Sequence, residues 1–434
     1  MDLPIKTILT PEELPKQWYN ILPDLPVEFP PYLNPATNEP VPGEALMELF
    51  PVECIKQEVS PERYIDIPAE IREAYYRLGR PSPLYRAKRL EEKLKTPAKI
   101  FLKREDLSPP GSHKPNTAIA QAYYARQEGI EKLTTETGAG QWGSALAYSC
   151  ALMGIDLQVF MVRVSYQQKP YRKHLMNLYG ANVVPSPSNL TPFGKKMLEK
   201  DSNHPGSLGI AISEAIQAAM SDDKAKYTLG SVLNHVILHQ TVVGQEALLQ
   251  YKKLDIVPDI LIGCVGGGSN FAGFAFPAIG KKLRKEDGYE KMKIVAVEPT
   301  ACPSITGPGS EYKYDFGDTA QQTPIVKMYT LGVDFVPPPI HAGGLRYHGA
   351  APSVSLLANE KVIQSVAYPQ EEIFQSAKLL AMTEGLVCAP ETAHALHHAI
   401  IEAKNAKEEK IIVYNHSGHG IFDLEGFKQV LKFD

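Results

Sequence analysis

The sequence predicts an α/β protein in which parallel sheets are covered by helices on both faces. From about residue 80 onward, short apolar runs with strand character alternate with longer helix-like segments. Several of the strand-like runs end in turns rich in glycine, proline or serine, which break a strand before a helix begins. A chain of 434 residues is long enough for two domains or for one large α/β unit.

Seven runs show the strand pattern most clearly, because each is short, largely apolar and bounded by turn residues. Two other zones, about 185–206 and 300–340, are dense in proline, glycine, serine and aspartate, and we expect long surface loops there. The seven predicted strands lie near residues 98–104, 131–136, 156–162, 181–184, 259–265, 293–298 and 410–415.

The first part of the chain, to about residue 75, differs from the rest. It is rich in proline and aromatic residues and has neither a helical nor a strand period. Trp18, Tyr19, Phe29 and Tyr32 make it too apolar for a free tail, so we predict an extended arm that packs over a larger body. A helix is expected over about residues 68–79.

The composition excludes several classes of function. The chain is 44% hydrophobic and 22% charged with a net charge of −4, which gives no reason to expect nucleic acid or a membrane as partner. Its start lacks the layout of a signal peptide, and no apolar run approaches the ~20 residues of a membrane span. Scattered cysteines without a CxxC pair are typical of reduced thiols in a cytoplasmic protein.

A lysine at the start of a predicted helix is the first candidate for chemistry. Residues 106–117 (DLSPPGSHKPNT) join a strand-like run to a helix-like run, and Pro115 suits the first helical turn. Lys114 is therefore expected at the helix N-terminus, where the macrodipole disfavours a cation. Such a lysine loses its proton more readily and can form a Schiff base. The alternative is a solvated lysine at a helix start.

Two further strand-to-helix turns are predicted to bind anions. In residues 266–270 (GGGSN), three glycines let the backbone wrap a phosphate, and Ser269 and Asn270 add donors. Residues 136–141 (ETGAGQ) form a second turn of small residues, which suits a carboxylate or phosphate. Glu136 is expected at the C-terminal edge of its sheet, where open α/β folds place their ligands.

A fourth turn places Ser417 at the end of the strand-like run 411–416, where its hydroxyl can equally serve as a helix cap. All four turns are expected at C-terminal strand edges. An activated lysine, a phosphate cradle, an anion loop with a glutamate and a strand-end serine are together what a pyridoxal-phosphate enzyme requires.

These stretches resemble the signature sequences of the tryptophan synthase β chain. GSHKPN (111–116), ETGAGQ (136–141) and GGGSN (266–270) match three of them, over a resemblance that covers roughly residues 80–425. Two further matches are Glu384-Gly385 with PETAHA (390–395), and NHSG (415–418). The long arm is similar to that of the divergent second branch of β chains.

The resemblance implies fold type II of the pyridoxal-phosphate enzymes. This fold has two three-layer αβα domains, with mainly parallel twisted sheets and pyridoxal 5′-phosphate between them. Residues 1–79 would form the arm and a helix that pack on the body. Residues 113–230 would form the N-terminal domain, and residues 80–112 with 231–434 the C-terminal domain.

The resemblance also implies an activity, the synthesis of L-tryptophan from indole and L-serine or O-phospho-L-serine by β-replacement. Lys114 would hold the cofactor and move the α proton of the substrate. Glu136 would help the leaving group depart and take the indole N–H proton as C3 attacks the aminoacrylate. Ser417 would face the pyridine nitrogen, where a hydroxyl favours β-elimination over transamination.

The resemblance also implies which residues of this chain bind the cofactor and the substrate. The cofactor would be held by His113, Lys114, Asn116, Ser231, Gly266, Gly267, Gly268, Ser269, Asn270, Glu384, Ser417 and Gly418. The substrate carboxylate would be held by Thr137, Gly138, Ala139, Gly140 and Gln141.

One departure from the family concerns the amino-acid donor. The main family has a Gly-Leu-Asp segment whose aspartate handles the serine hydroxyl, whereas this chain has Arg346 after Gly344-Leu345. A guanidinium suits phosphate bidentately, so we hypothesise that O-phosphoserine is the preferred donor and that Arg346 binds the leaving phosphate, with His348 as a possible helper. The alternative is that Arg346 pairs with a neighbouring acid when a lid closes.

A second departure concerns partners. Residues 229–240 (LGSVLNHVILHQ) replace a glycine- and proline-containing stretch of the main family. The rewritten segment after residues 136–141 lies in the region that communicates with the α chain, so we expect α-chain binding to be weak, transient or absent. The family implies a homodimer. His235 and His239 are spaced for one helix face, but helix packing is favoured over a metal site.

Two rival functions remain open at this point. Serine or threonine dehydratases and threonine synthase also eliminate at the β or γ carbon, but they lack the loop that Glu136 begins. A non-catalytic scaffold that binds a partner chain would need neither Lys114 nor the glycine loop.

Overall fold

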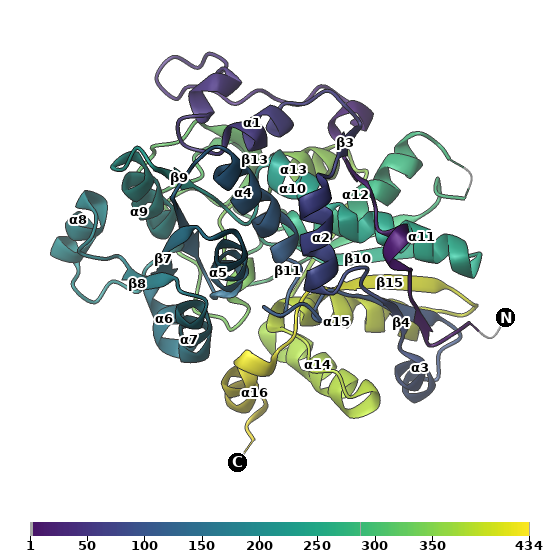
Figure 1. Cartoon of the computed structure of the whole chain (residues 1–434). Helices are drawn as coiled ribbons and strands as arrows, with labels where there is room; N and C mark the ends of the chain where they lie inside the picture. Colours follow the sequence, from purple (N-terminus) through teal and green to yellow (C-terminus); the bar gives the residue numbers. More distant parts are fainter. Residues whose placement is uncertain (1–2, 287, 434) are drawn as a thin grey trace.

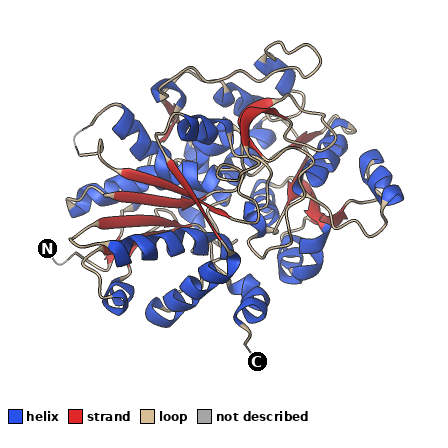
Figure 2. Cartoon of the chain, turned by 180° about the vertical axis from the view of Figure 1, so that it is seen from behind, coloured by secondary structure: helices blue, strands red, loops and turns tan. Residues whose placement is uncertain are grey.

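Two main sheets organise the chain. The structure is a computed structural model that describes residues 3–286 and 288–433. The larger sheet has the strand order β1-β4-β5-β15-β10-β11-β14 and the smaller one β8-β7-β6-β9, and all neighbours are parallel except at β4, which is antiparallel to β1 and β5. Figure 2 shows helices on both faces of the larger sheet.

The strands of these sheets are mostly short. The larger sheet comprises β1 (Lys6–Thr7), β4 (Leu84–Arg86), β5 (Lys99–Arg104), β10 (Ile260–Cys264), β11 (Lys293–Pro299), β14 (Gln364–Tyr368) and β15 (Ile411–His416). The smaller sheet comprises β6 (Lys132–Thr137), β7 (Asp156–Val162), β8 (Asn182–Ser186) and β9 (Ala225–Tyr227). Two further antiparallel pairs join β2 (Gln17–Tyr19) to β3 (Tyr64–Asp66) and, as a hairpin, β12 (Glu311–Asp315) to β13 (Val326–Thr330).

The α-helices alternate with the strands along most of the chain. They are α1 (Val52–Glu58), α2 (Ala69–Leu78), α3 (Lys88–Leu94), α4 (Pro115–Gln127), α5 (Gln141–Met153), α6 (Arg163–Gln168), α7 (Pro170–Leu178), α8 (Pro192–Lys200), α9 (Leu208–Met220), α10 (Asn234–Gln240), α11 (Val242–Leu254), α12 (Ser269–Leu283), α13 (Pro352–Asn359), α14 (Gln370–Glu384), α15 (Pro390–Asn405) and α16 (Leu424–Leu431).

The larger sheet is buried on both faces, which is why its central strands are continuous apolar runs. In β10, Leu261 belongs to the core formed with α11 and α12, whereas Ile260 and Ile262 belong to the core formed with α14 and α15. Successive strand residues point to opposite faces, so the strand needs apolar residues at every position rather than at every second one.

All seven predicted strands are confirmed, each within two residues of its predicted bounds. The strands that were missed have only two or three residues, such as β1 and β9, or are half-exposed, such as β14, and they lack a long apolar run. The two predicted loop zones are partly wrong, because α8 lies in the first and the β12–β13 hairpin in the second. The predicted division into domains stays a prediction.

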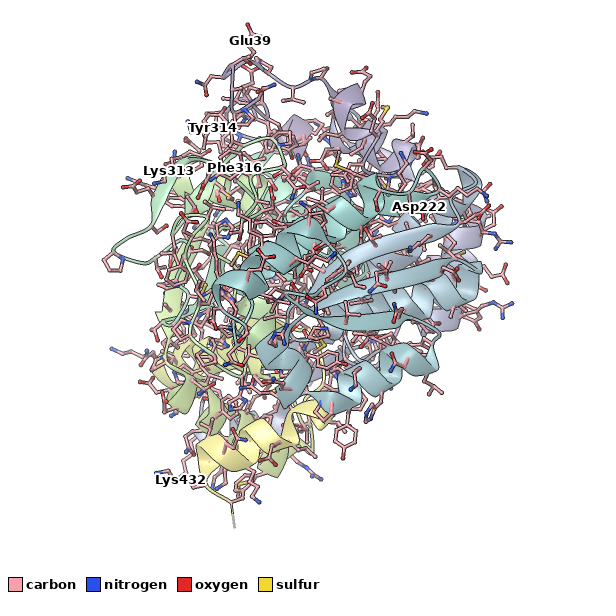
Figure 3. All side chains as sticks on the ribbon, turned by 90° about the vertical axis from the view of Figure 1, so that its left-hand side faces the viewer. Glu39, Asp222, Lys313, Tyr314, Phe316 and Lys432 are labelled. Carbon is pink, nitrogen blue, oxygen red and sulfur yellow. The ribbon has the colours of Figure 1, made fainter. Side chains whose placement is uncertain are left out.

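The N-terminal arm runs across one side of the molecule (Figure 1). Its Trp18 and Tyr19 are buried in the same core as α11 and α12, and Leu33 exchanges two backbone hydrogen bonds with Ile325 beside β13. The tip of the arm at Glu39 therefore lies at the same end of the molecule as Tyr314 of β12 (Figure 3). Within the described residues, no helix has the length and apolar character needed to cross a lipid bilayer.

Candidate active site

A cavity lies where the carboxyl ends of β6, β10 and β15 meet the N-termini of α4, α5, α12 and α15. The structure brings most of the predicted site residues to it. Fourteen of them line the cavity: His113, Lys114, Glu136, Thr137, Gly138, Ala139, Gln141, Ser231, Gly266, Gly267, Gly268, Ser269, Asn270 and Ser417.

Lys114 stands at the start of α4, as predicted. The pKa of its amine is lowered, and burial is the main cause because a buried ammonium loses its hydration. The carboxylates of Glu391 and Glu136 act in the opposite sense by favouring the charged form. The direction of the shift agrees with the prediction, but burial rather than the helix dipole accounts for most of it.

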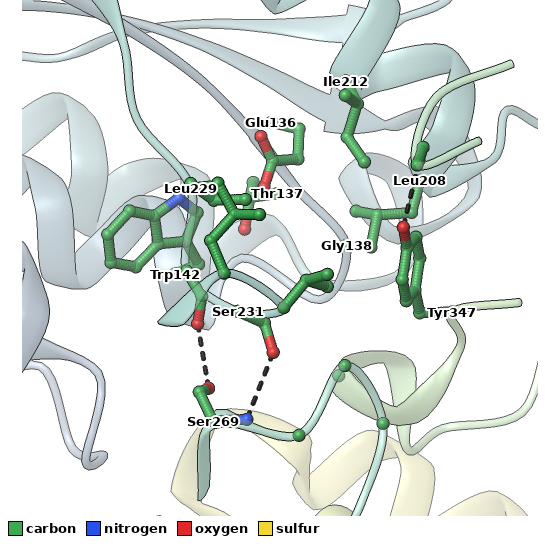
Figure 4. A pocket seen from close by; sticks show the side chains of 18 of the residues that line it. Glu136, Thr137, Gly138, Trp142, Leu208, Ile212, Leu229, Ser231, Ser269 and Tyr347 are labelled. Carbon is green, nitrogen blue, oxygen red and sulfur yellow. Dashed lines mark hydrogen bonds between the residues drawn. The ribbon is translucent and has the colours of Figure 1, made fainter. Parts of the chain in front are cut away.

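The glycine turn before α12 has the shape of a phosphate cradle. Gly268 has a φ of +106°, and a Cβ at Gly267 would lie 2.5 Å from the Ser231 hydroxyl oxygen, so larger residues are excluded. The Ser269 N–H donates to Ser231 Oγ at 3.2 Å, and the Ser269 hydroxyl donates to the Gly230 carbonyl at 2.9 Å (Figure 4). Ser231 thereby ties the residue 229–233 loop to the cradle.

His113 and Ser417 lie side by side at the cavity wall. The His113 N–H donates to the Ser417 carbonyl at 3.0 Å, and His113 Nε2 is buried without a hydrogen-bond partner among the described residues. Burial lowers the pKa of His113 to about 3, so the ring is neutral at physiological pH. The Ser417 hydroxyl lies 2.7 Å from the Thr392 hydroxyl and 3.8 Å from Cys264 Sγ.

Glu136 is the buried carboxyl of the site. Burial raises its pKa to about 7, and a hydrogen bond from the Tyr227 hydroxyl to Glu136 Oε2, 2.7 Å long, acts in the opposite direction. A carboxyl with a pKa near neutrality can both give and take a proton, which is the requirement for general acid–base catalysis.

The loop after Glu136 closes another part of the cavity wall. Thr137 accepts from the Gly143 N–H at 3.1 Å, and Gln141 donates to Glu391 at 3.2 Å. Gly140 itself does not line the cavity. Its φ is +90° and a Cβ there would lie 2.7 Å from Arg172 Cβ, so its role is to let the loop turn into α5.

The remaining wall of the cavity is apolar, as Figure 4 shows for Leu208, Ile212 and Leu229. Part of it comes from the N-terminal arm, and the rest from α9, the 229–233 loop and the segment around β13. The apolar lining residues include Leu46, Phe50, Leu208, Ile212, Leu229, Val232, Leu233, Pro324 and Val326.

Besides Gly140, four predicted residues lie outside the cavity lining, and their side chains or backbone groups have other partners. Glu384, at the end of α14, accepts from the Leu90 N–H at 2.7 Å and the Tyr85 hydroxyl at 2.9 Å. Asn116 accepts from Arg80 at 2.9 Å and donates to Gln240 at 3.1 Å, within a buried polar network. Gly418 donates to the Thr392 hydroxyl at 3.2 Å, which positions the turn rather than a ligand.

The fourth is Arg346, whose guanidinium points away from the cavity. Its Nη2 donates to the Pro337 carbonyl at 3.1 Å, although its neighbours Leu345 and Tyr347 both line the cavity. His348 lies 2.9 Å from the Phe316 carbonyl through Nε2 and does not line the cavity either. Arg346 forms no ion pair among the described residues, and the alternative expectation, a pair with a neighbouring acid when a lid closes, stays a prediction.

Sequence reasoning missed Glu391 and Tyr227. Glu391, in the first turn of α15, accepts from the Gly344 N–H at 2.8 Å and faces Lys114. In the sequence, residues 390–395 are only a match to the family, and the glutamate predicted to bind the cofactor is Glu384. Tyr227 sits on a three-residue edge strand, which gave no signal in the sequence.

His235 and His239 bind neighbouring side chains on α1. His235 Nδ1 lies 2.7 Å from Glu58 and His239 Nε2 lies 2.7 Å from Gln57. The preferred interpretation of these histidines as helix-packing residues is confirmed.

Comparison with known proteins agrees with this geometry. A family model described as pyridoxal-phosphate dependent enzyme matches residues 76–418. The tryptophan synthase beta chain of Thermococcus gammatolerans is 55% identical over 430 residues, which cover 98% of this chain and 96% of that protein. This chain belongs to the tryptophan synthase β chains. Tryptophan synthase beta chain 2 of Thermotoga maritima is 56% identical over 96% of this chain and 98% of its own, which confirms the resemblance to the second branch.

Solved structures share the fold. Threonine deaminase isoform 2 from Solanum lycopersicum covers 81% of this chain and 87% of its own with a TM-score of 0.59 at 19% identity. The α/β fold of type II pyridoxal-phosphate enzymes is therefore confirmed for this β chain.

The residues present fit pyridoxal phosphate. The cofactor, when bound, withdraws electrons from the substrate Cα. Lys114 offers a buried amine whose pKa is lowered, Gly266 to Asn270 form a cradle that a Cβ would fill, and His113 Nε2 is free to bind an oxygen. This cradle would hold the phosphate, and the Ser417 hydroxyl would face the pyridine nitrogen.

Proposed function

We propose that this β chain makes L-tryptophan by replacing the β-substituent of an L-serine donor with indole. The observation that carries the proposal is that one cavity joins a polar half, with Lys114 and Glu136, to an apolar half built from the arm and α9. A reaction between an amino acid and indole needs a polar region that binds the amino acid and, next to it, an apolar region that binds the indole ring.

The proposed roles follow from position. Lys114 attaches the cofactor and moves the proton at the substrate Cα. The backbone of residues 137–141, at the N-terminus of α5, binds the substrate carboxylate. Glu136 protonates the departing group and then takes the N–H proton of indole. The apolar wall holds the indole ring and excludes water, which would otherwise compete with indole.

The main rival function is β-elimination without addition of indole, as in a dehydratase. The apolar half of the cavity argues against a dehydratase, because such an enzyme uses water and releases ammonia, and neither needs an apolar binding surface. Tryptophan formation from indole, followed by absorbance with pyridoxal phosphate and a serine donor, tests the proposal. Release of pyruvate without tryptophan would contradict the proposal and would indicate a dehydratase.

For the donor, we retain O-phospho-L-serine beside L-serine. The feature that favours the phosphate ester is Arg346, a guanidinium that is 9% exposed and forms no ion pair among the described residues. With no countercharge beside it in the described part of the chain, this buried cation would bind strongly an anion that reached it. Contact with phosphate requires the side chain to turn from Pro337 toward the cavity.

Binding of the leaving phosphate by Arg346 can be tested with the variant Arg346→Ala. The variant is expected to lose at least ~10-fold in kcat/KM for O-phosphoserine, because a bidentate contact to the leaving phosphate is removed, and to change little with serine. Arg104→Ala, at a site where the guanidinium pairs with Asp106, is the matched control for loss of a buried arginine. Equal losses on both donors would show that Arg346 supports the fold only.

We also propose that the chain is a homodimer and that a tryptophan synthase α chain binds it weakly or not at all. The position of the arm supports weak or absent binding of an α chain, because the arm covers the side of the cavity at which Tyr32, Leu46 and Phe50 lie. Light scattering of the purified chain, alone and with an α chain, tests both statements.

A further inference from the structure

Tyr227 donates a hydrogen bond to the carboxylate that performs the proton transfers. Its hydroxyl lies 2.7 Å from Glu136 Oε2, and both side chains are buried. The two residues lie on neighbouring parallel strands, with Thr134 of β6 in register with Tyr227 of β9. The pairing of these two strands therefore places the Tyr227 hydroxyl next to the Glu136 carboxylate.

The N-terminal arm holds Tyr227 from the other side. The Tyr227 N–H donates to the Leu49 carbonyl at 2.9 Å, and the Phe50 ring lies 5.4 Å from the Tyr227 ring between centroids. Lys226 Nζ donates to the Glu48 carbonyl at 2.9 Å. The arm therefore covers the edge of β9, which would otherwise be an open strand edge with a free N–H.

We propose that Tyr227 is a positioning residue for the Glu136 carboxylate and that the N-terminal arm, through Leu49 and Phe50, keeps Tyr227 in place. The inference rests on the proposed function, because it assumes that Glu136 takes the indole proton. It gives the arm a part in the reaction itself, beyond its contribution to the apolar wall.

The chemical effect of Tyr227 follows from its donor role. A phenol that donates to a carboxylate stabilises the ionised form, and so it lowers the pKa that burial raises. It also restricts rotation of the carboxylate, which must remain directed at the substrate. Ionised Glu136 is the form that can accept the proton of indole.

Four other groups affect the ionisation of Glu136 or Tyr227. Lys114 faces Glu136 from the start of α4 and favours its ionised form, as does the Thr135 hydroxyl on β6. Tyr347 and Asp318 approach Tyr227 from the segments beside β12 and β13 and disfavour ionisation of its phenol. None of these groups changes in the variants below.

The test is the Tyr227→Phe variant, which keeps the ring against Phe50 and removes only the hydroxyl. We expect the acid limb of kcat/KM for indole to move to higher pH by about one unit, because the ionised carboxylate loses a charge-assisted hydrogen bond. The activity should fall ~10-fold near pH 6 and less above pH 8. Tyr251→Phe, on α11, is the matched control, since its buried hydroxyl has no partner among the described residues.

A second measurement does not depend on turnover. Infrared difference titration of the protein against its Glu136→Gln variant reports protonation of this one carboxyl, and Tyr227→Phe should raise the midpoint. An unchanged midpoint, or an unchanged pH profile in an enzyme that makes tryptophan, would overturn the inference. A wild-type protein that makes no tryptophan would instead overturn the proposed function, and the titration would still decide whether Tyr227 acts on Glu136.

The arm is tested by Phe50→Leu, which leaves the Tyr227 hydroxyl in place but removes the ring that packs on it. The same direction of shift is expected, with a smaller size. If Tyr227→Phe shifts the profile and Phe50→Leu does not, the part of the proposal that involves the arm is wrong.

Discussion

At the residue scale, the reactivity of Lys114 depends on two opposing effects. Burial favours the neutral amine that can bind the cofactor, while the nearby carboxylates of Glu391 and Glu136 favour the ammonium. Glu391 is fixed by the Gly344 N–H and by Gln141, so its charge acts from a constant position. The same carboxylate that organises the cavity thus limits how far the lysine pKa falls.

Replacing Glu391 by glutamine should therefore lower the pKa of Lys114 further. The carboxylate raises this pKa, so its removal shifts the balance toward the neutral amine and lets the apoprotein take up pyridoxal phosphate at lower pH. The rate of covalent cofactor attachment, followed by absorbance against pH, measures the shift. Glu384→Gln is the control, since Glu384 binds Leu90 and Tyr85 instead, and an equal shift there would contradict the assignment.

At the element scale, the loop before α10 stores strain next to the cavity. Val232 has a φ of +77°, and the Leu233 N–H donates to the Ser231 carbonyl at 3.0 Å, which makes a γ-turn that a β-branched residue adopts at a cost. Glu58 of α1 accepts from the N–H groups of Asn234 and His235 at 2.9 and 2.8 Å and so anchors the start of α10. The Tyr32 hydroxyl also donates to Glu58.

Glu58→Gln should destabilise the protein by about 2–4 kcal/mol near neutral pH, because a buried anion with several donors is lost. Burial opposes ionisation of Glu58, but His235 and the hydrogen bonds lower its pKa below the ordinary 4.5. A lowered pKa stabilises the fold above pH 4.5, and this contribution is lost as the pH falls. Urea unfolding at two pH values should show a smaller deficit in acid.

The matched control for this variant is Glu53→Gln, a half-exposed glutamate on the same helix. It should change stability by less than about 0.5 kcal/mol. A deficit of Glu58→Gln that is the same at neutral and acidic pH would show that the charge of Glu58 is not what anchors α10.

At the scale of the whole molecule, the arm is a structural part of the core. Trp18 is fully buried, its ring lies 4.6 Å from that of His239 between centroids, and the Tyr19 N–H donates to the Thr241 hydroxyl at 2.9 Å. The arm thus connects α10, the cavity wall and the β12–β13 hairpin, which are far apart in the sequence.

Trp18→Ala is therefore expected to cost about 3–5 kcal/mol of unfolding free energy, as for other large buried aromatic residues. Urea unfolding should remain a single transition, because the arm shares its core with α11 and α12. Tyr64→Ala, on the paired strand β3 and 48% exposed, is the control and should have a small effect. A separate early transition in Trp18→Ala would mean that the arm unfolds independently.

Features that consecutive residues encode can be predicted from the sequence of this chain. Lys114, residues 136–141, residues 266–270 and Ser417 each lie in a short strand–turn–helix segment, and parallel strands that end at one edge bring such segments together. The buried central strands were equally clear, since burial on both faces requires an uninterrupted apolar run. Fold class, cofactor and family followed from these local signals.

Which side chains face the cavity, and which partners they contact, depends on how the helices pack on the sheets. Glu391 rather than Glu384 faces Lys114, because the packing of α14 and α15 on the sheet sets which carboxylate points inward. For the same reason, Asn116 is directed into a neighbouring polar network and Arg346 toward the Pro337 carbonyl. Tyr227 meets Glu136 across 91 residues of sequence, and the arm reaches both from further away. Contacts of this kind arise from packing, which no run of consecutive residues specifies.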